Sequence, residues 1–414
     1  MKTAHKIAAV ALSVAAVTAS AETAFSQNTT PRGVSVYDRP RPDYDALGLR
    51  LGSFFLFPTT TISEEYNDNI YATKNNKKDD FITILHPSAT LVSNWSRHAL
   101  TLNAFSESGF YADHTDQNYW DFGTSAVGRV DIQRSTWLDA DISAGRLHES
   151  PSSENAQVGW KDPSEYYNYH AGAKLNHVFN RLGVAVGGVF DRNDYQSVQL
   201  RGGGTDSQTD RDRNVYETFT RVAYSVNPNL NPFVEGRYNW RRYDTDPGIS
   251  KDSEGYRIGT GVAMDFGGVT TGEVQAGWME QNYKDYDTSS SWYVSGGLLF
   301  TPTQLTSVRV DLDRSFQETS FAGSSGYIDT GLSARVEHEL RRNILLYGEG
   351  SFNYDDYDGI DLKEKIYTAG VGGNYLVNRH LRLGLGYTYS YRDSDIDYRE
   401  YKINQVMLSL IGSL

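Results

Sequence analysis

Apolar and polar residues alternate along most of the chain after residue 48, with the period of two that is typical of β-strands. At the C-terminal end, the apolar residues of one face are Val406, Leu408, Leu410 and Leu414. A strand at the end of a chain leaves one edge without a hydrogen-bonding partner, and an uncovered edge favours aggregation. The pattern fits either the edge of a soluble sandwich or a strand, residues 399–414, that pairs with the first strand and closes a barrel.

The same alternation divides residues 48–414 into about 18 segments, each long enough to cross a bilayer as a tilted strand. The predicted strands are residues 53–72, 80–94, 97–112, 117–133, 135–148, 164–178, 182–195, 211–226, 230–243, 254–266, 270–284, 289–301, 304–318, 326–339, 343–357, 363–377, 380–393 and 399–414. We therefore expect an all-β protein, a transmembrane antiparallel up-and-down β-barrel. An even strand number would return the C-terminus to the side on which the barrel begins.

The connections between these segments alternate in length. Short turns such as residues 133–135 and 180–182 are followed by long polar connections such as residues 149–164 and 197–212. Outer-membrane barrels have this asymmetry, because their periplasmic turns are short and their extracellular loops are long. The asymmetry favours the barrel over the sandwich.

The polar face of the predicted strands carries charges of both signs. An unpaired ion in a dry core costs several kcal/mol, whereas an ion in a water-filled lumen stays solvated. Such side chains could bind polar solutes through bidentate hydrogen bonds, or they could satisfy only one another across strands. The candidates for the wall of the lumen are Arg129, Arg221, Glu235, Arg237, Arg241, Arg257, Arg309, Asp311, Asp313, Arg335, Glu349 and Arg382.

Aromatic residues gather near the predicted strand ends, as at Tyr238, Trp240, Trp292 and Tyr293. Amphipathic rings prefer the level of the lipid headgroups, so these clusters favour interfacial girdles. The alternative is the ordinary preference of aromatic residues for strands.

The N-terminus predicts export. Lys2 and Lys6 precede an apolar stretch that ends near a small-residue cleavage pattern at residues 19–21. Residues 1–21 are therefore a predicted signal peptide that is removed, since the apolar stretch is too short for a transmembrane helix. We expect residues 22–47 to form an extended, Pro-rich periplasmic segment and residues 48–414 to form the outer-membrane barrel.

Composition narrows the possible functions. The chain has no Cys, which excludes disulfides, thiolate nucleophiles and thiolate metal sites. The net charge of −13 makes nucleic-acid binding unfavourable. After the N-terminus there is no apolar run long enough for a membrane-spanning helix, so any membrane span must be made of strands.

Catalytic and cofactor-binding motifs are missing. The chain contains no H-E-x-x-H, P-loop or G-x-S-x-G motif, and the residues Gly202 to Gly204 lack the Lys that a phosphate-binding loop needs. His338 is better explained as a residue at the rim of the barrel than as a metal ligand. Acidic clusters such as Asp393, Asp395 and Asp397 are better explained as solvated loops than as calcium sites. We expect no enzyme activity, no cofactor and no metal site.

The stretch from Val36 to Pro58, together with Tyr66-Asn-Asp-Asn-Ile-Tyr71, resembles the start of the outer-membrane β-barrel porins of alphaproteobacteria, of the beta-barrel porin 2 type. The resemblance covers about 35 residues. It implies an outer-membrane barrel, and some members of this family appear in exopolysaccharide secretion systems. It carries over no catalytic residue.

These observations predict a porin-like channel that passes polar solutes across the outer membrane of a Gram-negative bacterium, with both termini in the periplasm. The alternative is an outer-membrane component of an exopolysaccharide secretion system, whose N-terminal tail docks a periplasmic polysaccharide-export protein. The expected partners are outer-membrane lipid, lipopolysaccharide and the barrel-assembly machinery, and no nucleic acid is expected among them.

Overall fold

The structure is a computed structural model that describes residues 33–157, 159–245 and 248–414. The predicted signal peptide, residues 1–21, lies outside the described residues, as do residues 22–32. In the part of the chain that is described, no helix is long and apolar enough to span a membrane. Within the described ranges, helical structure consists of three 3₁₀ turns, η1 (Thr115–Gln117), η2 (Thr209–Arg211) and η3 (Asp397–Arg399).

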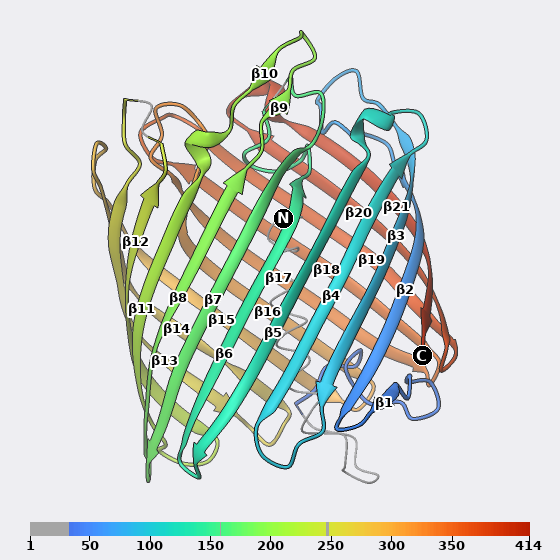
Figure 1. Ribbon diagram of the computed structural model, residues 1–414, viewed down its shortest axis with the longest axis vertical. Helices are drawn as coiled ribbons and strands as arrows, with labels where there is room; N and C mark the ends of the chain where they lie inside the picture. Colours follow the sequence, from blue (N-terminus) through green and yellow to red (C-terminus); the bar gives the residue numbers. More distant parts are fainter. Residues whose placement is uncertain (1–32, 158, 246–247) are drawn as a thin grey trace.

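The fold is a closed antiparallel barrel (Figure 1). Its sheet has 19 strands, of which the short β1 (Leu49–Leu51) is an extra strand on β2, so eighteen strands surround the lumen. These are β2 (Phe54–Asn67), β3 (Asp80–Ser93), β4 (Ala99–Tyr111), β5 (Tyr119–Gln133), β6 (Thr136–Glu149), β7 (Ser164–Phe179), β8 (Leu182–Tyr195), β11 (Arg213–Tyr224), β12 (Leu230–Tyr243), β13 (Ser253–Asp265), β14 (Thr270–Tyr283), β15 (Ser289–Thr303), β16 (Thr306–Gln317), β17 (Tyr327–Arg341), β18 (Ile344–Tyr357), β19 (Lys363–Asn378), β20 (Leu381–Ser394) and β21 (Tyr401–Ser413). A small hairpin, β9 (Val198–Gln199) with β10 (Thr205–Asp206), lies in the connection between β8 and β11.

The last strand closes the barrel on the first, as the sequence predicted. β21 pairs antiparallel with β2, from Ser413 opposite Thr59 to Gln405 opposite Asn67. Each predicted segment corresponds to one observed strand, and most bounds agree within two residues. The alternation of faces therefore located the strands correctly, and the soluble sandwich is excluded.

The first strand ends earlier than its predicted end at residue 72. Asn69 is fully buried, and its side-chain amide donates to the backbone oxygens of Thr73 and Lys402. The backbone N–H of Thr73 in turn donates to Asn69 Oδ1. Because an Asn side chain can replace the next ladder hydrogen bonds in this way, the chain turns after Asn67.

The two faces of the barrel differ as the alternation requires. On β21, Leu408 is 57% exposed on the outer surface, whereas Ser409 faces inward and its hydroxyl contacts the hydroxyl of Ser63 on β2 at 2.8 Å. Leu414 is exposed, and Ser413 contacts Thr59 on the inner side. Apolar side chains thus face lipid, and polar side chains face the lumen.

The two ends of the barrel also differ (Figure 1). Tight turns such as 134–135, 180–181 and 342–343 join the strands at one end, and long connections such as 150–163 and 196–212 join them at the other. We call these the turn end and the loop end. The C-terminus lies at the turn end.

The N-terminal segment differs from the expected extended tail. Residues 33–47 contain turns, with hydrogen bonds from Asp38 N to Ser35 O and from Tyr44 N to Arg41 O. They pack against the inner wall at the turn end. The X-Pro steps at Pro40 and Pro42 favour extended structure locally, but the contacts with the barrel outweigh that preference.

Candidate functional site

The lumen is the candidate functional site, because the charged side chains converge there. All twelve residues predicted for its wall lie on strands, at positions of the inward-facing parity. The strands that carry them are β5, β11, β12, β13, β16, β17, β18 and β20. The structure shows which of these residues contact one another, which the sequence left open.

A network of five ionised side chains lies on β11, β12 and β14. Arg221 contacts Glu235 at 2.7 Å and Glu273 at 3.0 Å. Arg237 contacts the same Glu235 at 2.7 Å and Glu217 at 2.6 Å. The guanidinium fork provides several donors, so each arginine serves two carboxylates.

The arginines of this wall also lie over aromatic rings. The guanidinium carbon of Arg221 is 3.9 Å from the ring centre of Phe233, and that of Arg257 is 5.0 Å from the ring centre of Tyr293. Cation–π attraction stabilises such contacts between a guanidinium group and a ring of the wall. Arg257 has no ion-pair partner among the described residues. The residue opposite it on β12 is another cation, Arg237.

Most of the remaining predicted residues form ion pairs or hydrogen bonds with other side chains of the barrel. Arg129 contacts Asp131 at 2.9 Å, and Arg309 contacts Asp311 at 2.9 Å. Asp313 accepts a hydrogen bond from Ser315. Arg335 pairs with Glu349 at 2.6 Å and with Glu337 at 2.9 Å. Arg241 pairs with Glu318. Arg382 has no ion pair among the described residues. The wall thus satisfies many of its own charges, as the second interpretation allowed.

On the part of the wall formed by β2 to β8, three inward histidines contact carboxylates. His86 contacts Glu107 at 3.1 Å, and His148 contacts Asp121 at 2.9 Å. His170 lies between two carboxylates, Asp141 at 2.5 Å and Asp191 at 2.7 Å. The sequence showed these histidines only as scattered residues, because their partners lie on neighbouring strands.

On β2 to β8 the inward carboxylates outnumber the inward cations. On β2 to β8, the inward cations are Arg129 and Lys174. The inward carboxylates on these strands include Glu65, Glu107, Asp121, Asp139, Asp141 and Asp191. The inward carboxylates on these strands outnumber the inward Lys and Arg side chains, so acidic groups predominate on this side of the lumen.

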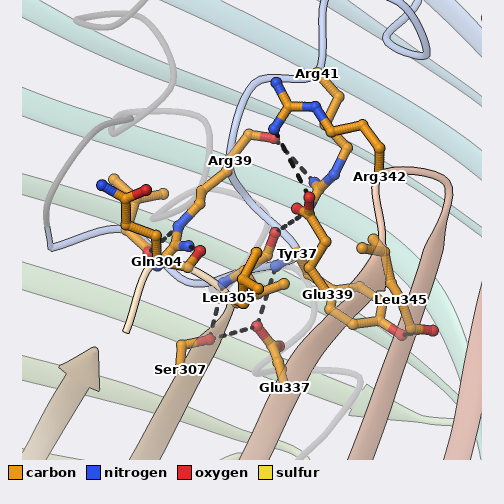
Figure 2. Close-up of polar contacts among 12 residues, drawn as sticks. Tyr37, Arg39, Arg41, Gln304, Leu305, Ser307, Glu337, Glu339, Arg342 and Leu345 are labelled. Carbon is orange, nitrogen blue, oxygen red and sulfur yellow. Dashed lines mark hydrogen bonds and ion pairs between the residues drawn. The ribbon is translucent and has the colours of Figure 1, made fainter. Parts of the chain in front are cut away.

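The N-terminal segment, residues 33–47, is anchored inside the turn end (Figure 2). Val36 is fully buried against Leu345 and Leu376, and its backbone N–H donates to Ser307 Oγ at 2.8 Å. The backbone N–H of Tyr37 donates to Glu337 at 3.1 Å. Burial raises the pKa of the Tyr37 phenol to about 12, so the phenol stays protonated at neutral pH.

Two arginines complete this anchor (Figure 2). Arg41 pairs with Glu339 at 3.0 Å, and the two side chains are 3% and 8% exposed. The same guanidinium donates to Val36 O at 2.6 Å, and Arg39 donates to Gln304 O. Arg41 therefore stabilises the turns within residues 33–47 and also attaches this segment to β17 of the wall.

The loop end is crossed by the connection between β6 and β7. Arg399, at the β20–β21 connection, donates to Glu154 O at 3.0 Å, and Arg392 on β20 donates to Ser152 O at 3.0 Å. Ser320, between β16 and β17, donates its N–H to Asn155 Oδ1 at 3.0 Å. Residues 152–155 thus reach from β6 to distant strands and narrow the mouth.

Buried ion pairs hold the loop end together. Arg399 contacts Glu364 at 2.6 Å, and Arg211 contacts Glu149 at 2.6 Å, with all four side chains at most 6% exposed. Glu318 pairs with Arg241. Burial alone would raise the pKa of the Glu318 carboxyl, but the neighbouring cations, Arg241 first among them, hold that pKa below its usual value.

Replacing Glu364 with glutamine is expected to release this mouth. The change leaves Arg399 buried without its carboxylate, which costs about 3–5 kcal/mol. We expect faster amide exchange and faster proteolysis at residues 150–157. The control is Asp356→Asn, which removes an exposed contact of 3.8 Å with Lys363 that is worth at most about 1 kcal/mol. Equal protection of the loop in both variants would show that the buried pair does not hold it.

Comparison with known proteins identifies the family. The family described as "Putative beta-barrel porin 2" matches residues 41–413. No curated protein matches the chain. Among solved structures, a BenF-like porin from Pseudomonas fluorescens Pf-5 is 10% identical, with a TM-score of 0.47 over 87% of this chain and 99% of that chain. OpdO from Pseudomonas aeruginosa is 14% identical, with a TM-score of 0.45 over 88% and 98% of the two chains.

The family match covers most of the chain, including every strand of the barrel. It agrees with the closed barrel, its apolar outer surface and its charged lumen. The chain therefore belongs to the beta-barrel porin 2 family, and it is a porin-like outer-membrane β-barrel.

Proposed function

We propose that the protein is a diffusion channel that passes small polar solutes across the outer membrane and prefers cations. The observation that carries this proposal is the excess of inward carboxylates on β2 to β8. A negative wall raises the local concentration of cations and repels anions. The segment at the turn end and the connection at the loop end narrow the path.

The orientation of the barrel is part of the same proposal. Short turns face the periplasm in barrels of this type, and long loops face outward. Accordingly, we place the turn end, with the C-terminus and residues 33–47, in the periplasm of a Gram-negative bacterium. The long polar connections, such as residues 150–163, then lie outside.

We also propose that the protein is not an enzyme. A hydrolytic triad needs a hydroxyl, an imidazole and a carboxylate in one chain of hydrogen bonds. Among the described residues, His177 contacts the Thr136 hydroxyl and His338 contacts the Thr306 hydroxyl, and neither histidine contacts a carboxylate. No described group of three or more His, Asp or Glu side chains has the arrangement of a metal site.

Planar-bilayer recording on the purified protein tests the channel. We expect discrete conductance steps and, under a potassium chloride gradient, a reversal potential of the sign that indicates cation preference. The absence of steps would contradict the channel. Steps with anion preference would contradict the role of the acidic wall while leaving the channel in place.

No observation favours the export alternative. That hypothesis needs a tail that is free to dock a periplasmic protein. In the described part of the tail, Val36, Tyr37 and Arg41 are engaged by the wall of the same barrel. A docking role would have to rest on residues 22–32 or on release of this anchor.

A further inference from the structure

A cavity of about 340 Å³ opens in the acidic wall of the lumen. It is lined by residues of β2, β3, β4, β5, β6 and β21, and Ser150 and Pro151 of the β6–β7 connection border it on the loop-end side. Its volume is at the lower end of the range for small-molecule sites, about 300–1,000 Å³. A single sugar-sized solute fits such a volume.

Two carboxylates from different strands face this cavity. Glu65 on β2 accepts a hydrogen bond from Gln405 at 2.5 Å. Glu107 on β4 accepts one from the Tyr119 hydroxyl at 2.9 Å and contacts His86 Nδ1 at 3.1 Å. These contacts fix the positions of both carboxylates, so the cavity has a preorganised negative charge.

The rest of the lining includes two histidines, His86 and His148, and each of them contacts a carboxylate. No Lys or Arg lines the cavity, so no side chain of the lining carries a permanent positive charge. Tyr111 and Tyr119 add aromatic rings, whose faces attract cations. The neutral polar groups of Ser63 and Asn67 can exchange hydrogen bonds with hydroxyl groups.

We propose that this cavity is a binding subsite for a solute that carries a protonated amine on a small hydroxylated ring, as an amino sugar does. The ammonium group lies between Glu65 and Glu107, and the ring packs against the tyrosines. The inference deepens the proposed channel function, on which it rests, by naming the class of solute that the acidic wall selects.

Calorimetric titration of the full chain in detergent micelles tests the subsite without any need for ion flow. The probes are glucosamine and its neutral counterpart N-acetylglucosamine. We expect glucosamine to bind about tenfold more tightly, because a charge-assisted hydrogen bond is lost with the charge. Equal affinity for the two sugars, or no binding of glucosamine, would overturn the proposal.

Substitution of the carboxylates locates the site. Glu65→Gln and Glu107→Gln are each expected to weaken glucosamine binding about tenfold and to leave N-acetylglucosamine unchanged. The matched control is Glu254→Gln, which alters a half-exposed carboxylate on the outer face of β13. Equal glucosamine affinity in all three variants would refute the site.

Binding and conductance separate the two proposals. Glucosamine binding without conductance steps would preserve the subsite and refute the channel. Conductance steps without glucosamine binding would support the channel and refute the subsite. If a variant does not fold, the comparison of the two sugars on the unmodified protein still decides the matter.

Discussion

Replacement of Leu408 with arginine is expected to destabilise the barrel strongly or to prevent its assembly. Leu408 is 57% exposed on the outer surface of β21, where its neighbours on the closing strand are also apolar. A cationic side chain on the lipid face costs about 2–4 kcal/mol near the middle of the membrane. The measurement is the urea midpoint for unfolding from lipid vesicles, together with the yield of assembled protein.

The neighbouring residue supplies the control. Ser409→Arg introduces the same side chain one position along β21, but this position faces the lumen, where its hydroxyl meets Ser63. In a water-filled lumen the charge stays solvated, so we expect a loss below about 1 kcal/mol. Equal damage from both substitutions would contradict the assigned facing of the closing strand.

Reversal of the charge at Arg41 is expected to open the turn end. In Arg41→Glu, two carboxylates would meet at the position of a buried ion pair with Glu339. Loss of such a pair costs about 3–5 kcal/mol, which favours the released segment about a hundredfold or more. We expect a larger single-channel conductance, measured in planar bilayers, while the barrel itself stays folded.

The double exchange Arg41→Glu with Glu339→Arg tests the pairing directly, because it restores opposite charges and should lower the conductance again. Arg50→Glu is the control for the change in net charge, since the Arg50 side chain is exposed, has no ion pair with another described residue and donates to Gly52 O at 3.3 Å. An increase of the same size in the Arg50 variant would show that charge alone, and not release of the segment, sets the conductance.

Different kinds of contact narrow the two ends of the barrel. At the turn end, one short segment with two arginines and a buried valine lies against several strands. At the loop end, the hydrogen bonds from Arg392 and Arg399 hold the β6–β7 connection across the opening. Both mouths are therefore closed in part by contacts between residues far apart in the sequence, and we expect both to open when a single charge is substituted.

The pattern of apolar and polar residues was sufficient to predict the barrel, its approximate strand number and which residues face outward. A strand presents alternate residues to opposite sides, so Leu408 and Ser409 had to face different surroundings. Short turns and long loops alternate along the chain because successive connections lie at opposite ends of the barrel, and outer-membrane barrels have short turns at one end and long loops at the other. The same parity also put the charged candidates, such as Arg221 and Glu235, on the inward face.

The partners of those charged side chains, by contrast, depend on how the closed barrel arranges its strands. His170 meets Asp141 and Asp191 because register brings three strands together, and no local pattern reports that meeting. The anchoring of Arg41 on Glu339, nearly three hundred residues away, depends on closure of the barrel around the segment. Strand periodicity is a local property of the chain, whereas ion pairs across a lumen depend on which strands the closed sheet places opposite one another.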